Sequence, residues 1–316
     1  MKKKLLNYSL MELSKGMDKM IDLHTHTSYS DGADSLIELL KKAESMNLEY
    51  ISITDHDNCK AYSELKNINI KDYFSGKIIP GIEIKCSYGR SLMEVLGYNV
   101  DPDKITAWAD EYYKDKSKPI LQAKYFDIMY NNCINYGLVM SDKKDVDFDP
   151  NVNWASVQIY KEIKKHPENE KLLPADLWAE FNVFSKKYCG NPKYPFYMDK
   201  TKDYPTLQDA IDVIKKSGGL VFIAHVFIYN WAEDKKKLLQ NILDSYNIDG
   251  IECIHSDFTE EESQYLLELC KNKNYYFSGG SDYHGKNKVN IEMAIGKGNL
   301  NIHSDLVKNW IKPLYN

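Results

Sequence analysis

Residue types that bind metal ions gather at five separate points of this 316-residue chain, each directly after a short apolar run. Imidazole nitrogen and carboxylate oxygen are the ligands that Zn, Mn and Fe accept in proteins. Ligands delivered from successive strand ends can surround more than one ion, so the pattern predicts a multinuclear metal site and metal-assisted hydrolysis. The clusters are His24-Thr25-His26 followed by Asp31, Thr54-Asp55-His56-Asp57, Gly81-Ile82-Glu83, Ala224-His225, and Gly280-Ser281-Asp282-Tyr283-His284.

Apolar runs alternate with amphipathic segments on both sides of the middle of the chain. Strands are expected at 20–23, 50–54, 78–84, 92–98, 220–224, 248–254 and 275–278. The strand at 92–98 returns from a hairpin turn at Tyr88-Gly89-Arg90. Helices are expected to begin after Ser35, Thr206 and Thr259, and Ser35 with Glu38 has the form of a capping box. This alternation predicts mainly parallel strands whose carboxyl ends, and therefore the ligands, face one rim.

The character of the sequence changes between residues 101 and 204, where long polar helical windows are rich in Tyr, Lys and Asn. We expect a helical insertion over the mouth of the pocket, where a lid would exclude water and contact substrate. A purely structural appendage is the alternative. The expected division is a barrel of residues 1–100 and 205–316 with an insertion of residues 101–204, since a barrel of this class needs about 250 residues or fewer.

Charge and cysteine usage narrow the class of protein. The net charge of −5 argues against a generally basic surface that would bind nucleic acid. Bound dications would nevertheless make an acidic pocket attractive to an anionic substrate. Six cysteines without a CxxC pair fit reduced thiols. No apolar stretch is long enough to span a bilayer, so we expect a cytoplasmic protein with no membrane contact and no stable protein partner.

The motifs, taken in order, resemble those of the PHP (polymerase and histidinol phosphatase) family. The resemblance covers nearly the whole chain, including a counterpart of the insertion, and the most similar subgroup is the stand-alone phosphoesterases of nucleoside bisphosphates or oligonucleotide ends. It implies a distorted (β/α)7 barrel with an inserted helical subdomain. The matching segments are Asp22-Leu23-His24-Thr25-His26-Thr27, Ser30-Asp31-Gly32, Ile53-Thr54-Asp55-His56-Asp57, Pro80-Gly81-Ile82-Glu83-Ile84, Ala224-His225 and Gly280-Ser281-Asp282-Tyr283-His284-Gly285.

The resemblance also implies two to three divalent ions, of Mn, Zn or Fe, held by a shared set of side chains. A bridging carboxylate, here Glu83, keeps two dications close enough to share a hydroxide nucleophile. Glu83 and Asp282 would hold and orient that nucleophile, and His225 or His284 would protonate the leaving group. The implied sites are His24, His26, Glu83 and Asp282 for one ion, His56 and Glu83 for a second, and Asp31, His225 and His284 for a third.

One position departs from the family pattern within the ligand set. The family usually has His two residues before the Leu-Gly-Tyr that matches Leu96-Gly97-Tyr98, and this chain has Glu94 there. Glu94 would ligate through oxygen and favour harder ions such as Mn, or it would leave the second site weakly occupied. Asp55 and Asp57 are expected to orient neighbouring imidazoles rather than to bind metal.

The anchor for the substrate phosphate is the least defined part of the site. Related phosphoesterases use arginines of the insertion, whereas the single arginine here is Arg90. Lys118 and Lys124 lie near the corresponding positions and are candidate anchors, with ordinary surface lysines as the alternative. His255 follows the strand at 248–254, so it should reach the rim and is a candidate substrate contact.

The function expected from these features is hydrolysis of a phosphomonoester by a metal-dependent phosphoesterase. The substrate would be small and phosphorylated, with a nucleoside bisphosphate or a short oligonucleotide as candidates. Three alternatives stay open: an exonuclease acting on short oligonucleotides, a metal-stabilised binding module without turnover, and a hydrolase of C–N bonds that uses the same metal chemistry.

Overall fold

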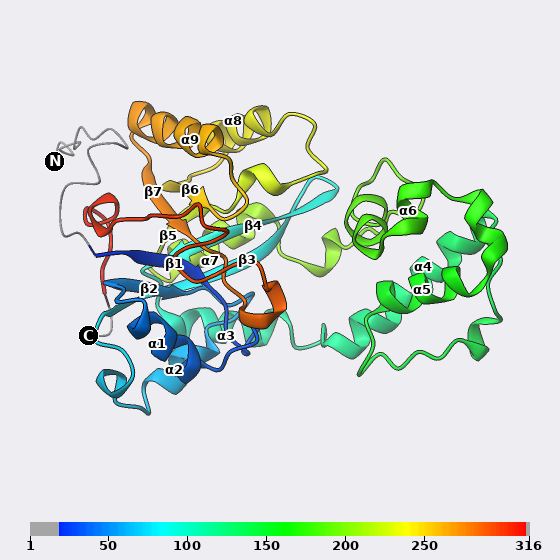
Figure 1. Cartoon of the computed structure of the whole chain (residues 1–316), viewed down its shortest axis with the longest axis horizontal. Helices are drawn as coiled ribbons and strands as arrows, with labels where there is room; N and C mark the ends of the chain where they lie inside the picture. The colour runs from blue at the N-terminus through cyan, green and yellow to red at the C-terminus, as the bar shows by residue number, and fades with distance from the viewer. Residues whose placement is uncertain (1–18, 314–316) are drawn as a thin grey trace.

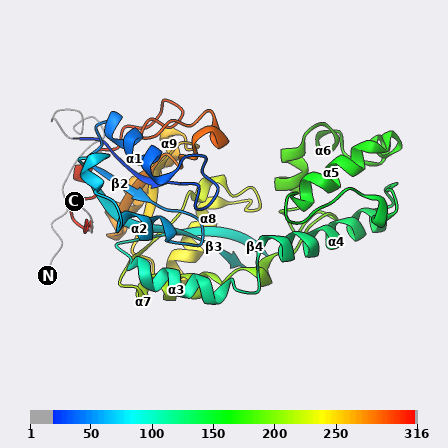
Figure 2. The ribbon, with the colours of Figure 1, turned by 90° about the horizontal axis from the view of Figure 1, so that it is seen from below.

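The computed structural model describes residues 19–313, which form a barrel lobe and a helical insertion lobe (Figure 1). The expected barrel included residues 1–18 and 314–316, which lie outside the described part. The view from below shows the insertion as a separate body joined to the side of the barrel on which the β3–β4 hairpin lies (Figure 2).

Seven strands form one sheet in sequence order, and its ends meet. Its pairs are parallel except for β3–β4 and β4–β5, which are antiparallel. A parallel bridge joins Thr25 of β1 to Tyr283, just after β7, and the two strands lie in contact, so the expected distorted seven-stranded α/β barrel is confirmed. The strands are β1 (Ile21–Thr25), β2 (Tyr50–Ile53), β3 (Lys77–Tyr88), β4 (Ser91–Tyr98), β5 (Leu220–Ile223), β6 (Gly250–His255) and β7 (Tyr276–Gly280).

Helices cover the outside of the barrel because each has one apolar face. In α7, the side chains of Leu207, Ala210, Ile211 and Ile214 are buried against β3, β4 and β5. Capping boxes open α1, α7 and α9 at Ser35, Thr206 and Thr259, which confirms the three expected helix starts. The barrel helices are α1 (Leu36–Ser45), α2 (Lys60–Leu65), α3 (Pro102–Tyr112), α7 (Leu207–Lys216), α8 (Lys235–Ser245) and α9 (Glu260–Lys273).

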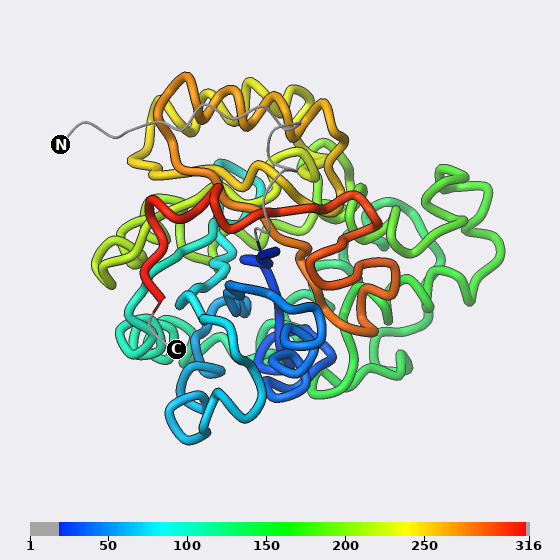
Figure 3. Tube along the Cα trace, turned by 60° about the vertical axis from the view of Figure 1, so that its left-hand side comes forward, coloured from blue at the N-terminus to red at the C-terminus, as the bar shows by residue number. Residues whose placement is uncertain are grey.

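The C-terminal segment closes the end of the barrel that lies away from the insertion. It runs beside the start of β1 (Figure 3), where Ile21 N donates to Ile302 O at 3.0 Å and Ser304 N donates to Lys19 O at 3.2 Å. Val307 and Trp310 are buried in the barrel core. These contacts cover the amino ends of the strands, so the opposite rim is left for a functional site.

The insertion has a hydrophobic core of its own. Phe126, Ile159, Leu177 and Phe184 belong to that core, whereas Ile105 of α3 belongs to the barrel core. Helix α3 packs on α2 and α7. We therefore propose that the body of the insertion begins with α4 (Lys118–Tyr136) and continues through α5 (Ala155–Lys165) and α6 (Ala175–Ala179).

Two further findings concern membrane-spanning helices and the cysteines. Within residues 19–313, no helix is both long and apolar enough to cross a membrane. All six cysteines are buried and free. The expectation of buried thiols without disulfides is therefore met.

The separate core of the insertion leads to a stability prediction. Ile159→Ala removes a fully buried side chain of α5, and we expect it to lower the free energy of unfolding by about 2–4 kcal/mol. Ile120→Ala is the matched control, because Ile120 is 54% exposed in the same lobe and should change stability by less than about 0.5 kcal/mol. Urea unfolding measures both. Equal losses for the two variants would contradict a packed core around Ile159.

Candidate metal centre

The rim of the barrel holds side chains from most of its strand ends. His24 lies in β1 and Glu83 in β3, while Asp282 lies two residues after the end of β7. Close approach of β7 to β1 depends on Gly280, since a Cβ atom there would lie 2.4 Å from the backbone nitrogen of His24. A side chain at residue 280 would separate the two strands, so this glycine keeps Asp282 beside His24.

The carboxylate of Glu83 lies at the middle of the centre and is 1% exposed. Its Oε2 atom is 3.3 Å from the Nε2 atoms of both His24 and His26, and 3.2 Å from Nδ1 of His56. Its Oε1 atom accepts a hydrogen bond from Nε2 of His225 at 2.8 Å. One carboxylate therefore contacts four imidazoles that come from three different segments of the chain.

Three sets of side chains around Glu83 have the spacing of metal ligands. In each set the ligand atoms lie within 4.8 Å of one another, as they also do in a fourth group of His24, Glu252 and His255, where Glu252 already accepts a hydrogen bond from His24. We call them the central group (His24, His26, Glu83 and Asp282), the outer group (His26, Asp31, His56 and His284) and the insertion-side group (Glu83, Glu94 and His225). His26 takes part in two groups because its two ring nitrogens face different carboxylates, Asp282 and Asp31.

The chemistry of these groups fits divalent cations. Six of their buried atoms have no hydrogen-bond partner: Nε2 of His24, both ring nitrogens of His26, Nδ1 of His56, Nδ1 of His225 and Oε2 of Glu83. A buried polar atom without a partner is costly, and coordination of an ion removes that cost. The donor set of imidazole and carboxylate suits Zn, Mn or Fe.

The structure corrects the expected division of ligands among the ions. His225 lies with Glu83 and Glu94, not with Asp31 and His284, because antiparallel pairing of β4 with β5 sets Val95 opposite Ile223 and brings Glu94 close to His225. His56 lies with the outer group, where its Nε2 is 3.6 Å from Oδ2 of Asp31, as well as beside Glu83.

Glu252 and Asp22 support the centre from behind, a role that was not expected of either residue from the sequence. Glu252 accepts a hydrogen bond at 2.8 Å from Nδ1 of His24 and another at 2.8 Å from the backbone nitrogen of His225. Asp22 accepts from the backbone nitrogens of Ser281 at 2.9 Å and of Ala294 at 2.7 Å. The signal that could have found them is a lone carboxylate inside an otherwise apolar strand, since it must be hydrogen-bonded there.

Asp55 and Asp57 do not orient imidazoles, so that expectation was wrong. Asp55 accepts hydrogen bonds from the backbone nitrogen of Thr27 at 2.8 Å and from the Ser30 hydroxyl at 2.6 Å. Asp57 accepts from the backbone nitrogen of Lys85 at 3.0 Å. Short side chains next to a strand end reach neighbouring loop backbone first, so these aspartates fix the loops that carry the ligands.

Carboxylates and imidazoles within the centre shift one another's pKa values. Burial alone would raise the pKa of Glu83, but the imidazoles of His24 and His56 hold it well below its usual range. Burial would lower the pKa of His26, yet Asp282 and Glu83 raise it to about 9. Burial lowers the pKa of His56 to about 4. The carboxylates are therefore ionised at neutral pH and ready to bind cations.

The candidate substrate contacts fall in different surroundings. Lys118 is exposed, with its ammonium 4.6 Å from the centre of the Trp154 ring. The ammonium of Lys124 is 2.5 Å from Oδ1 of Asp203. His255 is buried, with its Nε2 3.5 Å from Oδ2 of Asp282. Of the three, only His255 reaches a carboxylate of the centre.

Lys288 also reaches the centre and was missed by the sequence analysis. Its ammonium is 2.5 Å from Oδ2 of Asp282, and its side chain is 38% exposed. A lysine in the short helical turn after a ligand motif carries no distinctive sequence signal. It could have been suspected only from its place four residues after His284.

A cavity of about 560 Å³ opens from the centre toward the insertion. Glu94 forms part of its wall, so the cavity is continuous with the insertion-side group. Both lobes contribute lining residues, among them Arg90, Tyr229 and Trp231 from the barrel and Lys186, Tyr197 and Lys200 from the insertion. The mixture of aromatic rings and cationic groups suits an anionic ligand with a flat, apolar part.

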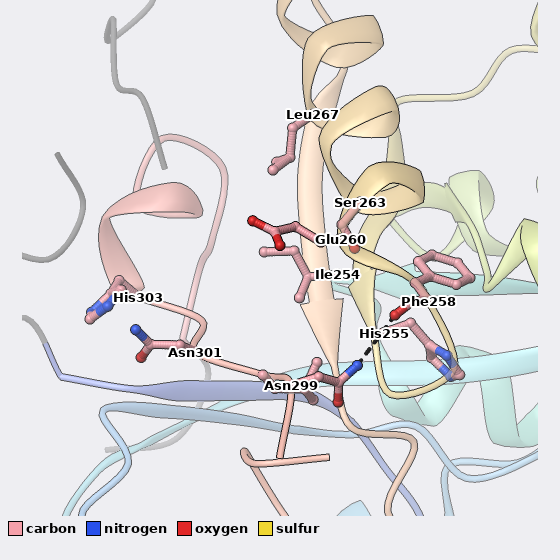
Figure 4. Close-up of a pocket in the computed structure, with 10 residues that line it drawn as sticks. Ile254, His255, Phe258, Glu260, Ser263, Leu267, Asn299, Asn301 and His303 are labelled. Atoms are coloured by element: carbon pink, nitrogen blue, oxygen red, sulfur yellow. Dashed lines mark hydrogen bonds between the residues drawn. The ribbon is translucent and has the colours of Figure 1, made fainter. Parts of the chain in front are cut away.

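A second cavity, of about 340 Å³, lies behind His255 (Figure 4). It is bordered by Phe258 and Leu267 on one side and by Asn299 and His303 on the other. Asn299 Nδ2 donates to the backbone oxygen of Phe258 at 3.3 Å across this region. Apart from His255, its lining residues do not belong to a ligand group, so we assign the cavity no part in the chemistry of the centre.

Comparison with known proteins agrees with this architecture. The family model described as the PHP domain matches residues 22–276, more than half of the chain. The chain therefore belongs to the PHP domain family.

Curated relatives share about a quarter of their residues with this chain. A 5'-3' exoribonuclease of Haemophilus influenzae is 25% identical, with 85% of this chain and 91% of the relative covered. A phosphoribosyl 1,2-cyclic phosphate 1,2-diphosphodiesterase of Eggerthella lenta is 24% identical, with 84% and 94% covered. A 3',5'-nucleoside bisphosphate phosphatase of Chromobacterium violaceum is 22% identical, with 84% and 87% covered.

A solved structure shows the same fold. It is an amidohydrolase from Chromobacterium violaceum with bound sulfate and no metal, which superposes with a TM-score of 0.60 at 19% identity. The match covers 86% of this chain and 89% of the other. At this level of identity the similarity concerns the fold alone.

Removal of the Glu252 carboxylate should weaken metal binding. In Glu252→Gln the bond to Nδ1 of His24 loses its charge, and we expect the affinity for Mn²⁺ to fall about 10–100-fold. Glu162→Gln, which changes another buried glutamate, in the insertion, should leave the affinity unchanged. Titration calorimetry measures both. An unchanged affinity in Glu252→Gln would show that its support of His24 does not matter for binding.

Asp57 should make the stability of the metal-free protein depend on pH. Burial raises the pKa of Asp57 to about 7, against about 3.9 in an unfolded chain. The contribution of protonated Asp57 to the free energy of unfolding is therefore complete below about pH 4 and is lost as the pH rises through 7. As the pH is raised from 5 to 8, the stability of Asp57→Asn relative to the native chain should therefore increase, by on the order of 1–2 kcal/mol.

Urea unfolding in the presence of EDTA, carried out at pH 5 and at pH 8, measures this difference. Asp142→Asn, at a site whose side chain is 76% exposed, is the control and should show no such gain. The assignment of Asp57 fails if its asparagine variant follows the native chain at both pH values.

Proposed function

We propose that this chain is a metal-dependent phosphoesterase that hydrolyses a phosphomonoester, with 3',5'-nucleoside bisphosphates as the first substrate class to test. The observation that carries the proposal is the buried Glu83 carboxylate among four imidazoles, with unpartnered ligand atoms directed toward one rim. Membership of the PHP domain family and relatives named for phosphoester cleavage support it.

The central and outer groups would hold the metal ions. Bound there, divalent Mn, Zn or Fe would supply Lewis acidity toward a phosphoryl oxygen and acidify a coordinated water. The chain itself supplies the geometry. Glu83 and Asp282 each face several imidazoles, so both carboxylates are positioned to hold and orient the nucleophile.

Two groups, Lys288 and His225, are placed to act on a bound phosphate, and His255 lies behind them. Lys288 sits on Asp282 at the exposed side, where its ammonium can bind a phosphoryl oxygen. His225, between Glu83 and Glu94, is placed to give a proton to the leaving oxygen. His255 is buried against Asp282, and we assign it a positioning role rather than contact with substrate.

The cavity beside the insertion suits the remainder of the substrate. Lys200 and Arg90 line it, and we propose these two, in place of Lys118 and Lys124, as contacts for a second phosphate. Aromatic rings of Tyr197 and Trp231 provide flat surfaces for a nucleobase. The insertion would therefore bind substrate directly and would be more than a structural appendage.

One alternative has an observation in its favour. The Haemophilus influenzae relative is named a 5'-3' exoribonuclease, so a short oligonucleotide is the second substrate class to test. The net charge of −5 argues against a long groove for nucleic acid. We propose cytoplasmic action as well, which six buried free thiols support.

Phosphate release from a panel of substrates tests the proposal. The panel contains a 3',5'-nucleoside bisphosphate, a ribosyl cyclic phosphate and a short 5'-phosphorylated RNA, each with protein reconstituted with Mn²⁺ or Zn²⁺. We expect His24→Gln to reduce turnover at least about 100-fold, because it removes a ligand of the central group. His166→Gln, which changes a histidine of the insertion, should retain turnover.

The distribution of products separates the alternatives. Release of one phosphate from the bisphosphate supports the proposal, whereas stepwise mononucleotides from RNA favour the exonuclease. Turnover no higher than that of His24→Gln on every substrate would refute phosphoester hydrolysis.

A further inference from the structure

Lys85 lies beside the insertion-side group and had no role in the sequence analysis. It follows Glu83 by two residues on β3, so both side chains point to the same face of the sheet. The register of the β3–β4 hairpin sets Lys85 directly opposite Glu94. Cross-strand neighbours of opposite charge attract each other, and the ammonium of Lys85 is 2.9 Å from Oε1 of Glu94.

The pair lies inside the site rather than on an open surface. The side chain of Glu94 is 14% exposed and that of Lys85 is 32% exposed. The second oxygen of Glu94 is 3.4 Å from Nε2 of His225. Glu94 is therefore held between an ammonium and an imidazole, and a pair of this burial is screened little by solvent.

The three ligand groups differ in how many of their ligand atoms already have a hydrogen-bond or ion-pair partner within the chain. In the insertion-side group, Nε2 of His225 donates to Oε1 of Glu83, and Glu94 binds Lys85. Two atoms of these residues, Oε2 of Glu83 and Nδ1 of His225, are among the buried unpartnered atoms, but Oε2 also faces the imidazoles of the central group and Nδ1 is the ring nitrogen not bonded to Glu83. The central group is the opposite case, because Nε2 of His24 and Oε2 of Glu83 have no partner. Oε1 of Glu83, Nε2 of His225 and both oxygens of Glu94 thus already contact other atoms of the chain.

Lys288 gives a useful contrast. It binds Oδ2 of Asp282, while Oδ1 of the same carboxylate faces His24 and His26. The central group keeps two imidazoles and Oε2 of Glu83 for an ion after Lys288 has bound. The insertion-side group has only three ligands, and Lys85 already binds one of the two carboxylate oxygens of Glu94. A dication there would be repelled by the ammonium at short range.

We propose that the ammonium of Lys85 takes the place of a third metal ion, so that the chain binds two divalent ions, in the central and outer groups. This inference rests on the proposed function only in requiring that those two groups bind metal. The charge that a third cation would bring to Glu94 is supplied by the chain itself.

Metal content after equilibrium dialysis against Mn²⁺, measured by plasma mass spectrometry, tests the inference. We expect two Mn²⁺ per native chain. Lys85→Met keeps the length of the side chain but frees the carboxylate of Glu94, so the content should rise to three. The double variant Lys85→Met with Glu94→Gln should return to two, because the freed carboxylate is then absent.

Lys200→Met is the matched control for loss of one positive charge. Lys200 lines the same cavity but forms no ion pair with a carboxylate of the centre in the described chain, so its variant should keep two ions. Lys85→Gln provides a second substitution in case Lys85→Met fails to fold, and circular dichroism checks folding of each. It too should bind three ions.

The results separate this inference from the proposed function. Three Mn²⁺ in the native chain, or two in a folded Lys85→Met or Lys85→Gln protein, would overturn the role of Lys85. Two ions in the native chain without phosphate release would instead count against the proposed function and leave the assignment of Lys85 in place.

Discussion

The carboxylate of Glu83, buried among the imidazoles of His24, His26, His56 and His225, is the interaction on which the rest of the site depends. An ionised carboxylate cannot stay buried without compensating partners. Those partners come from β1, from the loops after β1 and β2, and from the end of β5. The barrel must therefore close correctly for Glu83 to be tolerated, so the arrangement of the site and the closure of the fold are linked.

Two antiparallel strand pairings give this barrel its particular chemistry. Reversal of the chain at the β3–β4 hairpin brings Glu94 across from Lys85 and, through β5, next to His225. The same hairpin extends toward the insertion, where the backbone oxygen of Arg90 accepts a hydrogen bond from the hydroxyl of Tyr197. One hairpin thus connects the metal centre, the cavity and the insertion.

The sequence was sufficient to predict the barrel and the clusters at its rim, because alternation, capping boxes and strand-end ligands are local patterns. Ser35, Thr206 and Thr259 begin helices as expected. It was not sufficient to assign His56 and His225 to their groups, since strand register and loop direction decide which ligands meet. Glu252, Lys85 and Lys288 escaped notice because each acts through a partner that is distant in the sequence or through the path of a short turn.

The tight seam at Gly280 restricts how this protein can diversify. Any side chain there would push the first and last strands apart and carry Asp282 away from its imidazoles. New substrate preferences must therefore arise on the other side of the molecule, where the insertion meets the hairpin and side chains can change without disturbing barrel closure. A mutational library aimed at altered specificity would be most productive when confined to that wall.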